Sequence, residues 1–255
     1  MDTEGVIMEV KESKRRKWTD RLIRVLIIVL IFIGVGVYIY ADDYYRPSLT
    51  AEEALAGGEG ITFEETGGDL VFTPADPEGG VVIYPGGRVS ERAYGYLGRK
   101  IAAMGYKTVI VRAPLKLSIF SNYAAEDYVS DEEISDWVII GHSLGGVSAS
   151  RFVKKNPYKI RGLILLAAYP DGRTDLSAST FKVFSLVGDK DLIIDYEKLN
   201  EAQDRLPKAT YGQIIRGGNH SSFANYGTQD GDSLADIGYE EQQQFVLDAV
   251  LEAFK

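Results

Sequence analysis

Cysteine is absent from this chain of 255 residues, and histidine occurs only twice. Without cysteine there are no disulfide bonds, no thiolate metal sites and no cysteine nucleophile. Two histidines are too few for a histidine-rich metal site, so we expect neither a bound metal nor a cofactor. Basic residues are also in deficit, with 28 Lys and Arg against 37 Asp and Glu. Nucleic-acid binding, which depends on Lys and Arg neutralising phosphates, is therefore not expected.

One long segment near the N-terminus lacks charge altogether. Val25–Ala41 reads VLIIVLIFIGVGVYIYA. If residues 22–24 are included, with the Arg24 side chain extending its charge towards lipid headgroups, the segment reaches the roughly 20 residues that cross a bilayer. We therefore predict a transmembrane anchor at residues 22–41, with the lipid bilayer as its partner.

The charges on either side of this segment predict its orientation. Residues 1–24 contain seven Lys or Arg, whereas Asp42 and Asp43 follow the segment. By the positive-inside bias, residues 1–21 form a cytoplasmic tail of a single-pass cell-membrane protein whose large domain is extracytoplasmic. A cleaved signal peptide is the alternative, but its apolar core is usually shorter and ends in a small-x-small site. Ile39 occupies the position that would need a small residue before Ala41, which favours an uncleaved anchor.

Beyond the anchor we predict a stalk at residues 42–50 and a folded domain at 51–255. Thr50 and Glu53 have the spacing of a capping box for a short helix. Short apolar runs then alternate with amphipathic stretches; expected strands are 61–65, 70–73, 81–84, 107–111, 137–140, 163–168, 182–187 and 211–215, and expected helices are near 94–104, 123–130, 145–155, 196–205 and the C-terminus. This alternation predicts an α/β fold with a mostly parallel sheet and helices on both faces.

The motif Gly141-His142-Ser143-Leu144-Gly145 has the G-x-S-x-G spacing of a nucleophile elbow. Such a strand-to-helix turn is too tight for side chains beside the serine, which explains the two glycines. The apolar run WVII enters the motif and a helical segment leaves it, which distinguishes it from an ordinary Gly/Ser turn. Ser143 is therefore the candidate nucleophile.

A serine nucleophile needs a base, and histidine is the usual one near neutral pH. His142 lies within the elbow and is expected to point away from the serine, so His220 is the candidate base. His220 follows the last expected strand, downstream of Ser143. This is the chain order Ser…Asp…His that such hydrolases use.

A carboxylate is needed to orient the histidine, and three aspartates follow the strand at 182–187. We predict Asp191 for this role. Asp189 is expected to stabilise its own turn, and Asp195 is a more distant candidate. For the oxyanion hole we expect the backbone amide of Leu144 together with that of Gly87, or else Arg88, in the loop after the strand at 81–84.

Four stretches, YPGGRVSERAY, WVIIGHSLGG, LVGDKD and GGNHSSFANYGTQDGD, resemble the lid-less α/β hydrolases related to dienelactone hydrolase. The resemblance covers about residues 51–255. It implies an α/β-hydrolase fold and, position by position, the set Ser143, Asp191 and His220. This chain has serine where dienelactone hydrolase has cysteine, so lactone specificity is not implied. We assign no role to Gln229 and Asp232 in the last stretch beyond loop packing.

The expected function is hydrolysis of a small acyl ester through an acyl-enzyme. Only about a dozen residues separate the strands at 163–168 and 182–187, where lids are usually inserted in this superfamily, so an open site is expected. An acyltransferase or peptidase would use the same three residues, because fold alone does not choose the acyl acceptor. A hydrolase-like binding module without catalysis and a purely structural membrane protein are the remaining alternatives.

Overall fold

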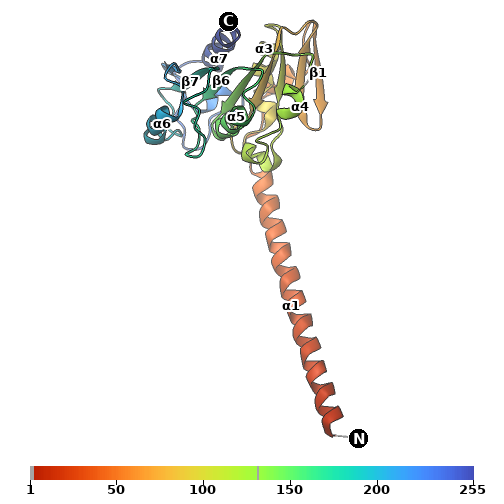
Figure 1. The fold of residues 1–255 in the computed structure, drawn as a ribbon. Coiled ribbons are helices and arrows are strands. Elements are labelled where there is room, and N and C mark those ends of the chain that lie inside the picture. The colour runs from red at the N-terminus through yellow and green to blue at the C-terminus, as the bar shows by residue number, and fades with distance from the viewer. Residues whose placement is uncertain (1–2, 131) are drawn as a thin grey trace. The chain divides into compact units, whose positions relative to one another are not determined.

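The protein is described by a computed structural model covering residues 3–130 and 132–255, with side chains described from residue 18. The chain divides into two compact units, Met1–Asp43 and Tyr44–Lys255. The first is a single helix, α1 (Thr3–Asp42; Figure 1). Its part from Trp18 to Asp42 contains an 18-residue window with a mean hydropathy of 2.9 and is long enough to span a membrane. A signal sequence would share these properties.

The second unit is built on one eight-stranded sheet. Its strands are β1 (Ile61–Thr66), β2 (Asp69–Pro74), β3 (Gly79–Tyr84), β4 (Tyr106–Ile110), β5 (Trp137–His142), β6 (Ile160–Leu166), β7 (Lys182–Gly188) and β8 (Tyr211–Ile215). They lie in the order β1-β2-β4-β3-β5-β6-β7-β8. The β1–β2 and β2–β4 pairs are antiparallel, and the other described strand pairs are parallel. The predicted α/β fold with a mostly parallel sheet is confirmed.

Helices cover both faces of this sheet (Figure 1). They are α2 (Leu49–Ala54), α3 (Gly95–Ala102), α4 (Glu126–Val129), α5 (Leu144–Lys155), α6 (Tyr196–Ala202) and α7 (Tyr239–Phe254). Successive side chains of a strand point to opposite faces. Val81 and Ile83 of β3 therefore pack with α3 and α7, whereas Val82 and Tyr84 pack with α4 and α5. Because both faces are covered, β3 and β5 are buried along their whole length.

The segment predicted as a stalk lies against the domain. The Tyr45 amide donates to the Arg88 carbonyl at 2.7 Å, and the Ser48 amide donates to the Asn225 carbonyl at 2.8 Å. The prediction that Thr50 caps the following helix is wrong. Ser48 is the N-cap, and its hydroxyl accepts from the Ala51 amide, because the helix begins at Leu49, two residues earlier than a Thr50 cap would require.

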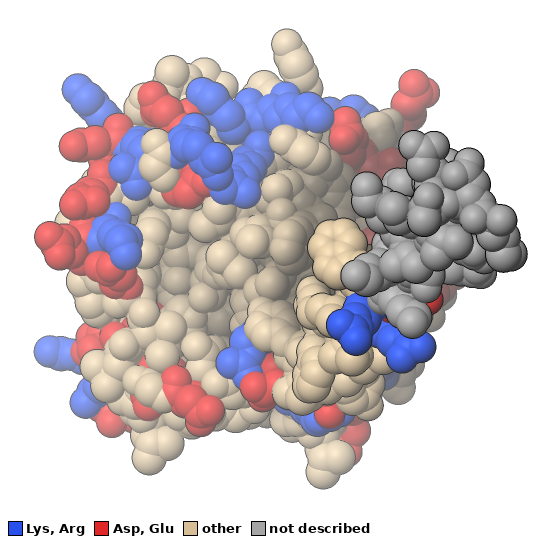
Figure 2. Space-filling view, turned by 90° about the horizontal axis from the view of Figure 1, so that it is seen from below, with Lys and Arg blue, Asp and Glu red and all other residues tan. Residues whose placement is uncertain are grey.

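Charge is unevenly distributed over the face seen in Figure 2. Lys and Arg side chains are densest along the upper margin, with others at the left and lower edges and beside the grey atoms, and the hollowed centre of the face is mainly tan, that is, uncharged. Among the described residues on this face, basic side chains therefore do not extend across the centre.

Candidate active site

Ser143 stands at a sharp turn between two regular elements. Strand β5 ends at His142 and helix α5 begins at Leu144. The backbone of Ser143 has φ 51° and ψ −123°, a strained conformation for a residue with a side chain. Such strain at a strand-to-helix turn exposes the serine hydroxyl at the carboxyl edge of the sheet.

The two glycines of the motif make this turn possible. A Cβ on Gly145 would lie 2.1 Å from the Tyr84 carbonyl oxygen, and one on Gly141 would lie 2.5 Å from Gly146 Cα. Both clashes are with backbone, which cannot move aside as a flexible side chain could. Gly145 is therefore required by close packing against the end of β3, and Gly141 by close packing against the start of α5.

Asp191 and His220 are brought together from the loops after β7 and β8. Oδ2 of Asp191 lies 2.9 Å from Nδ1 of His220, and both side chains are buried. Oδ1 of Asp191 accepts from the backbone amides of Ile193, at 2.8 Å, and Ile194, at 2.9 Å. A buried carboxylate needs such partners to offset its lost hydration. They also fix its orientation, so that Oδ2 faces the imidazole.

The two other candidate aspartates have different partners. Oδ1 of Asp189 accepts from the Gly217 amide at 2.7 Å. The prediction that Asp189 stabilises its own turn is therefore wrong, since it bonds instead to the loop that carries His220. Asp195 caps helix α6 by accepting from the Lys198 amide, and it forms an ion pair with the Lys198 ammonium at 2.9 Å. Asp191 is thus the carboxylate at His220.

Ser143 and His220 line the same cavity, which has a volume of about 230 Å³. Its remaining walls are mainly apolar and come from the first turn of α5, the residues after β6 and the loop after β7: Leu144, Val147, Ala167, Ala168, Tyr169, Ile193, Ile194 and Asp195. Among the described residues, Nε2 of His220 has no hydrogen-bond partner although it is buried. The ring nitrogen opposite Asp191 is therefore available beside the serine cavity.

The candidate oxyanion-hole amides come from neighbouring strand ends. Leu144 is the first residue of α5, where the amide has no acceptor within the helix. A Cβ on Gly87 would lie 3.1 Å from the Leu144 side chain, so the two residues are adjacent. The Arg88 amide already donates to the Lys116 carbonyl at 2.8 Å. Of the two residues considered for the second amide, Gly87 is therefore the one whose amide remains unengaged within the described chain.

Asp232, which the sequence left without a role, connects the two loops of the site. Its Oδ2 accepts from both the amide and the hydroxyl of Ser221, the residue after His220. Its Oδ1 accepts from the amide of Leu192, the residue after Asp191, at 3.3 Å. Asp232 therefore hydrogen-bonds to the residue that follows Asp191 and to the residue that follows His220. No local sequence signal indicates this role, because it depends on two loops meeting.

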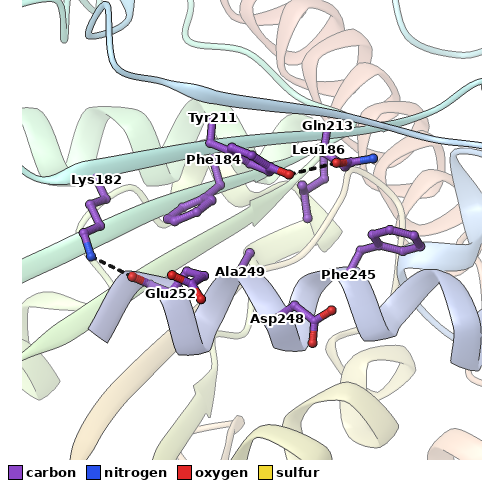
Figure 3. Close-up of a pocket in the computed structure, with 9 residues that line it drawn as sticks. All are labelled: Lys182, Phe184, Leu186, Tyr211, Gln213, Phe245, Asp248, Ala249 and Glu252. Carbon is purple, nitrogen blue, oxygen red and sulfur yellow. Dashed lines mark hydrogen bonds between the residues drawn. The ribbon is translucent and has the colours of Figure 1, made fainter. Parts of the chain in front are cut away.

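A larger groove of about 540 Å³ lies elsewhere, between β7, β8 and α7 (Figure 3). Its polar groups are partly paired with one another: the Lys182 ammonium donates to the Glu252 carbonyl, and the Tyr211 hydroxyl donates to the Gln213 amide oxygen. It is lined by no serine or histidine. This groove is larger than the Ser143 cavity, but of the two only the smaller one is lined by both a serine and a histidine.

A metal site is not evident in the part of the chain that the structure describes, where no three His, Asp or Glu side chains are grouped to bind an ion. Asp191 and His220 bond to each other, and the other described aspartates near them are occupied by amides or ammonium groups. The chemistry that this arrangement supports is acid–base and nucleophilic.

Comparison with known proteins shows which family the chain belongs to. The sequence model of the alpha/beta hydrolase family matches residues 80–244, more than half of the chain, and the protein belongs to this family. The matched region runs from β3 to the start of α7 and includes Ser143, Asp191 and His220. No curated protein matches the chain in sequence.

Solved structures share the fold at low sequence identity. Dienelactone hydrolase from Anabaena variabilis has a TM-score of 0.59 and 13% identity, covering 76% of this chain and 98% of that one. A carboxylesterase from Bacillus subtilis has a TM-score of 0.57 and 12% identity, with coverages of 87% and 98%. Naproxen esterase, also from Bacillus subtilis, has a TM-score of 0.56 and 16% identity, with coverages of 81% and 96%.

Proposed function

We propose that the protein is a serine hydrolase that cleaves small carboxylic esters, with Ser143 as nucleophile, His220 as base and Asp191 as the acid that orients the base. The observation that carries this proposal is the buried bond between Asp191 and His220 beside the cavity that holds Ser143. Membership of the alpha/beta hydrolase family supports it.

The reaction would proceed in two halves. Nε2 of His220 takes the proton of the Ser143 hydroxyl as its oxygen attacks the ester carbonyl, and the amides of Leu144 and Gly87 stabilise the resulting oxyanion. The imidazolium, balanced by Asp191, then protonates the leaving alcohol and an acyl-serine remains. Water, deprotonated by His220, attacks this ester, and release of the carboxylic acid restores the serine.

The size of the cavity supports a small acyl group. Its volume of about 230 Å³ lies below the range of roughly 300–1,000 Å³ that accommodates drug-sized ligands. Its walls include the small side chains Ala167 and Ala168 at the end of β6 and the apolar side chains Ile193 and Ile194. The chain between β6 and β7 contains no helix, so this part of the described structure provides no helical lid.

We further propose that α1 anchors this hydrolase in the cell membrane, with residues 1–21 in the cytoplasm and the catalytic domain outside. The length and hydropathy of the segment Trp18–Asp42 support the anchor. The excess of Lys and Arg before residue 25 supports the orientation.

The decisive experiment is to treat the full-length protein in detergent with a fluorophosphonate probe and to measure turnover of p-nitrophenyl acetate. Ser143→Ala should abolish labelling and lower turnover by several orders of magnitude, because the members of such a triad act as one unit. Ser150→Ala is the matched control. It removes a buried hydroxyl of the same helix that has no described hydrogen-bond partner, and it should leave both readouts unchanged.

Near-normal turnover by Ser143→Ala would overturn the proposal. Labelling of wild-type Ser143 without turnover of any ester, from acetyl to longer acyl groups, would instead point to an acyl acceptor other than water.

A further inference from the structure

His142, the histidine that the proposed mechanism does not use, is part of a buried hydrogen-bonded chain. Its Nδ1 lies 2.6 Å from the Tyr94 hydroxyl, and its Nε2 lies 3.1 Å from the backbone carbonyl of His220. The Tyr94 hydroxyl also accepts from the Gly86 amide at 2.8 Å. Tyr94 and His142 are completely buried, and His220 is 1% exposed.

The chemistry of the groups in this series of hydrogen bonds determines which atom donates and which accepts in each. The His220 carbonyl can only accept, so Nε2 of His142 carries the proton. Burial, and then the neighbouring His220 ring, lower the pKa of His142 well below its ordinary value, so the ring is neutral and Nδ1 accepts. The Tyr94 hydroxyl therefore donates to Nδ1 while it accepts from Gly86. The direction of each of the three hydrogen bonds is therefore defined.

We infer that Tyr94 and His142 are positioning residues that hold the oxyanion loop and the base in register. This inference rests on the proposed serine-hydrolase function. This series of hydrogen bonds begins at the amide of Gly86, next to the proposed oxyanion donor Gly87. It passes through His142 beside Ser143 and ends at the backbone carbonyl of His220. It therefore joins the three loops that must keep a fixed geometry during the reaction.

The packing of the two histidine rings adds to this role. Their centroids are 4.9 Å apart, and Phe223 lies on His142 at 5.8 Å. A neutral His142 leaves the His220 ring free to become an imidazolium, whereas a second positive charge at this distance would oppose it. A residue that touches the base in this way acts through it and not on the substrate.

The test is Tyr94→Phe, which removes one hydroxyl and leaves the ring in place. Its matched control is Tyr84→Phe. Tyr84 is equally buried, and among the described residues its hydroxyl bonds to the backbone of Asn122 and Ala125, on the other face of the sheet. In the full-length protein, Tyr94→Phe should lower kcat for p-nitrophenyl acetate about 10- to 100-fold with KM changed less than about threefold, because misplacement of reacting groups affects the chemical step. Tyr84→Phe should keep kcat within about twofold at a similar loss of thermal stability.

Equal losses of kcat in the two variants, or no loss in Tyr94→Phe, would overturn the inference. A second measurement does not depend on the variants folding. Because the chain has only two histidines, ¹⁵N-histidine NMR of the wild type resolves both. His142 should be the neutral form protonated at Nε2, with Nδ1 as acceptor, and the opposite tautomer would overturn the inference. If wild-type Ser143 shows neither labelling nor turnover, the proposed function fails, but this NMR result still stands or falls by itself.

Discussion

At the scale of single residues, the geometry of the site depends on the hydrogen bonds made by the two carboxylate oxygens of Asp191. One carboxylate oxygen accepts from two backbone amides and the other faces the His220 imidazole. Removing water from a carboxylate is costly unless hydrogen bonds replace it, and here they do so at both oxygens. Asp191 is therefore held in one rotamer, and so is the ring that it contacts.

This arrangement predicts a large difference between two neighbouring substitutions. Asp191→Asn should lower kcat by about 10³- to 10⁴-fold, because an amide at this position favours the wrong histidine tautomer. Asp189→Asn should have an effect of less than about tenfold, since an amide oxygen can still accept from the Gly217 amide. Steady-state kinetics with p-nitrophenyl acetate measure both. Similar losses in the two variants would show that the assignment of the acid is wrong.

The buried neutral His142 predicts how stability depends on pH. Its pKa in the folded protein is lowered, mainly by burial, whereas in the unfolded chain it returns to about 6.5. Below pH 6.5 the unfolded state therefore binds one more proton at this residue. The free energy of unfolding should fall with decreasing pH, by at most about 1.4 kcal/mol per pH unit from this group.

Urea unfolding between pH 7.5 and 5.5, followed by fluorescence of the buried Trp137, measures this dependence. His142→Asn has no titrating ring at this position and should show a flatter profile over the same window. Identical slopes for the two proteins would contradict the prediction.

At the scale of elements, the turn between β5 and α5 depends on contact between backbones. Gly145 meets the carbonyls of Tyr84 and Pro85 at the end of β3, where even one carbon atom has no room. The helix start, the strand end and the oxyanion loop consequently pack as one piece. The strained Ser143 conformation persists because these neighbours over-determine it.

Gly145→Ala should therefore remove activity and lower the free energy of unfolding by about 3 kcal/mol or more, as expected when backbone must shift in a packed core. Gly172→Ala is the matched control, since a Cβ there meets no atom within 4 Å. It should leave activity and the urea midpoint unchanged. An active, fully stable Gly145→Ala protein would show that the elbow is looser than this packing implies.

At the scale of the whole molecule, the apolar helix of the first unit bears on where the hydrolase domain is located in the cell. The helix from Trp18 to Asp42 exposes its apolar side chains along its described length. In water such a surface would be unfavourable, whereas in a bilayer it is solvated by lipid. Either a membrane anchor, as proposed above, or a signal sequence has such an exposed apolar surface.

We expect the full-length protein to resist carbonate extraction from membranes and external protease to release its domain from intact cells or spheroplasts. The double substitution Ile28→Lys and Ile31→Lys should shift it to the soluble fraction, because each charge near the centre of a span costs about 2.5–3.5 kcal/mol. A mature N-terminus near Ala41 would instead identify the segment as a cleaved signal. Domain activity should survive the double substitution.

The sequence by itself determined the features that are local in the chain. The apolar run at Val25–Ala41, the alternation of strands and helices, and the spacing of Gly141, Ser143 and Gly145 each reflect neighbours within a few residues. Strand positions and the mostly parallel sheet could be predicted for this reason. His220 could be selected as the candidate base because the sequence contains only one other histidine, which lies within the elbow.

Only the tertiary structure decided what depends on loops meeting. Three aspartates follow β7 within seven residues, and position and family resemblance favoured Asp191, but the contact of its carboxylate with His220, 29 positions away, is seen only in the folded structure. Asp232 and Tyr94 are further examples, since their partners belong to segments distant in sequence. Hydrogen bonds of this kind form only after the sheet has placed its strand ends side by side, so their physical cause is long-range packing, which no local pattern encodes.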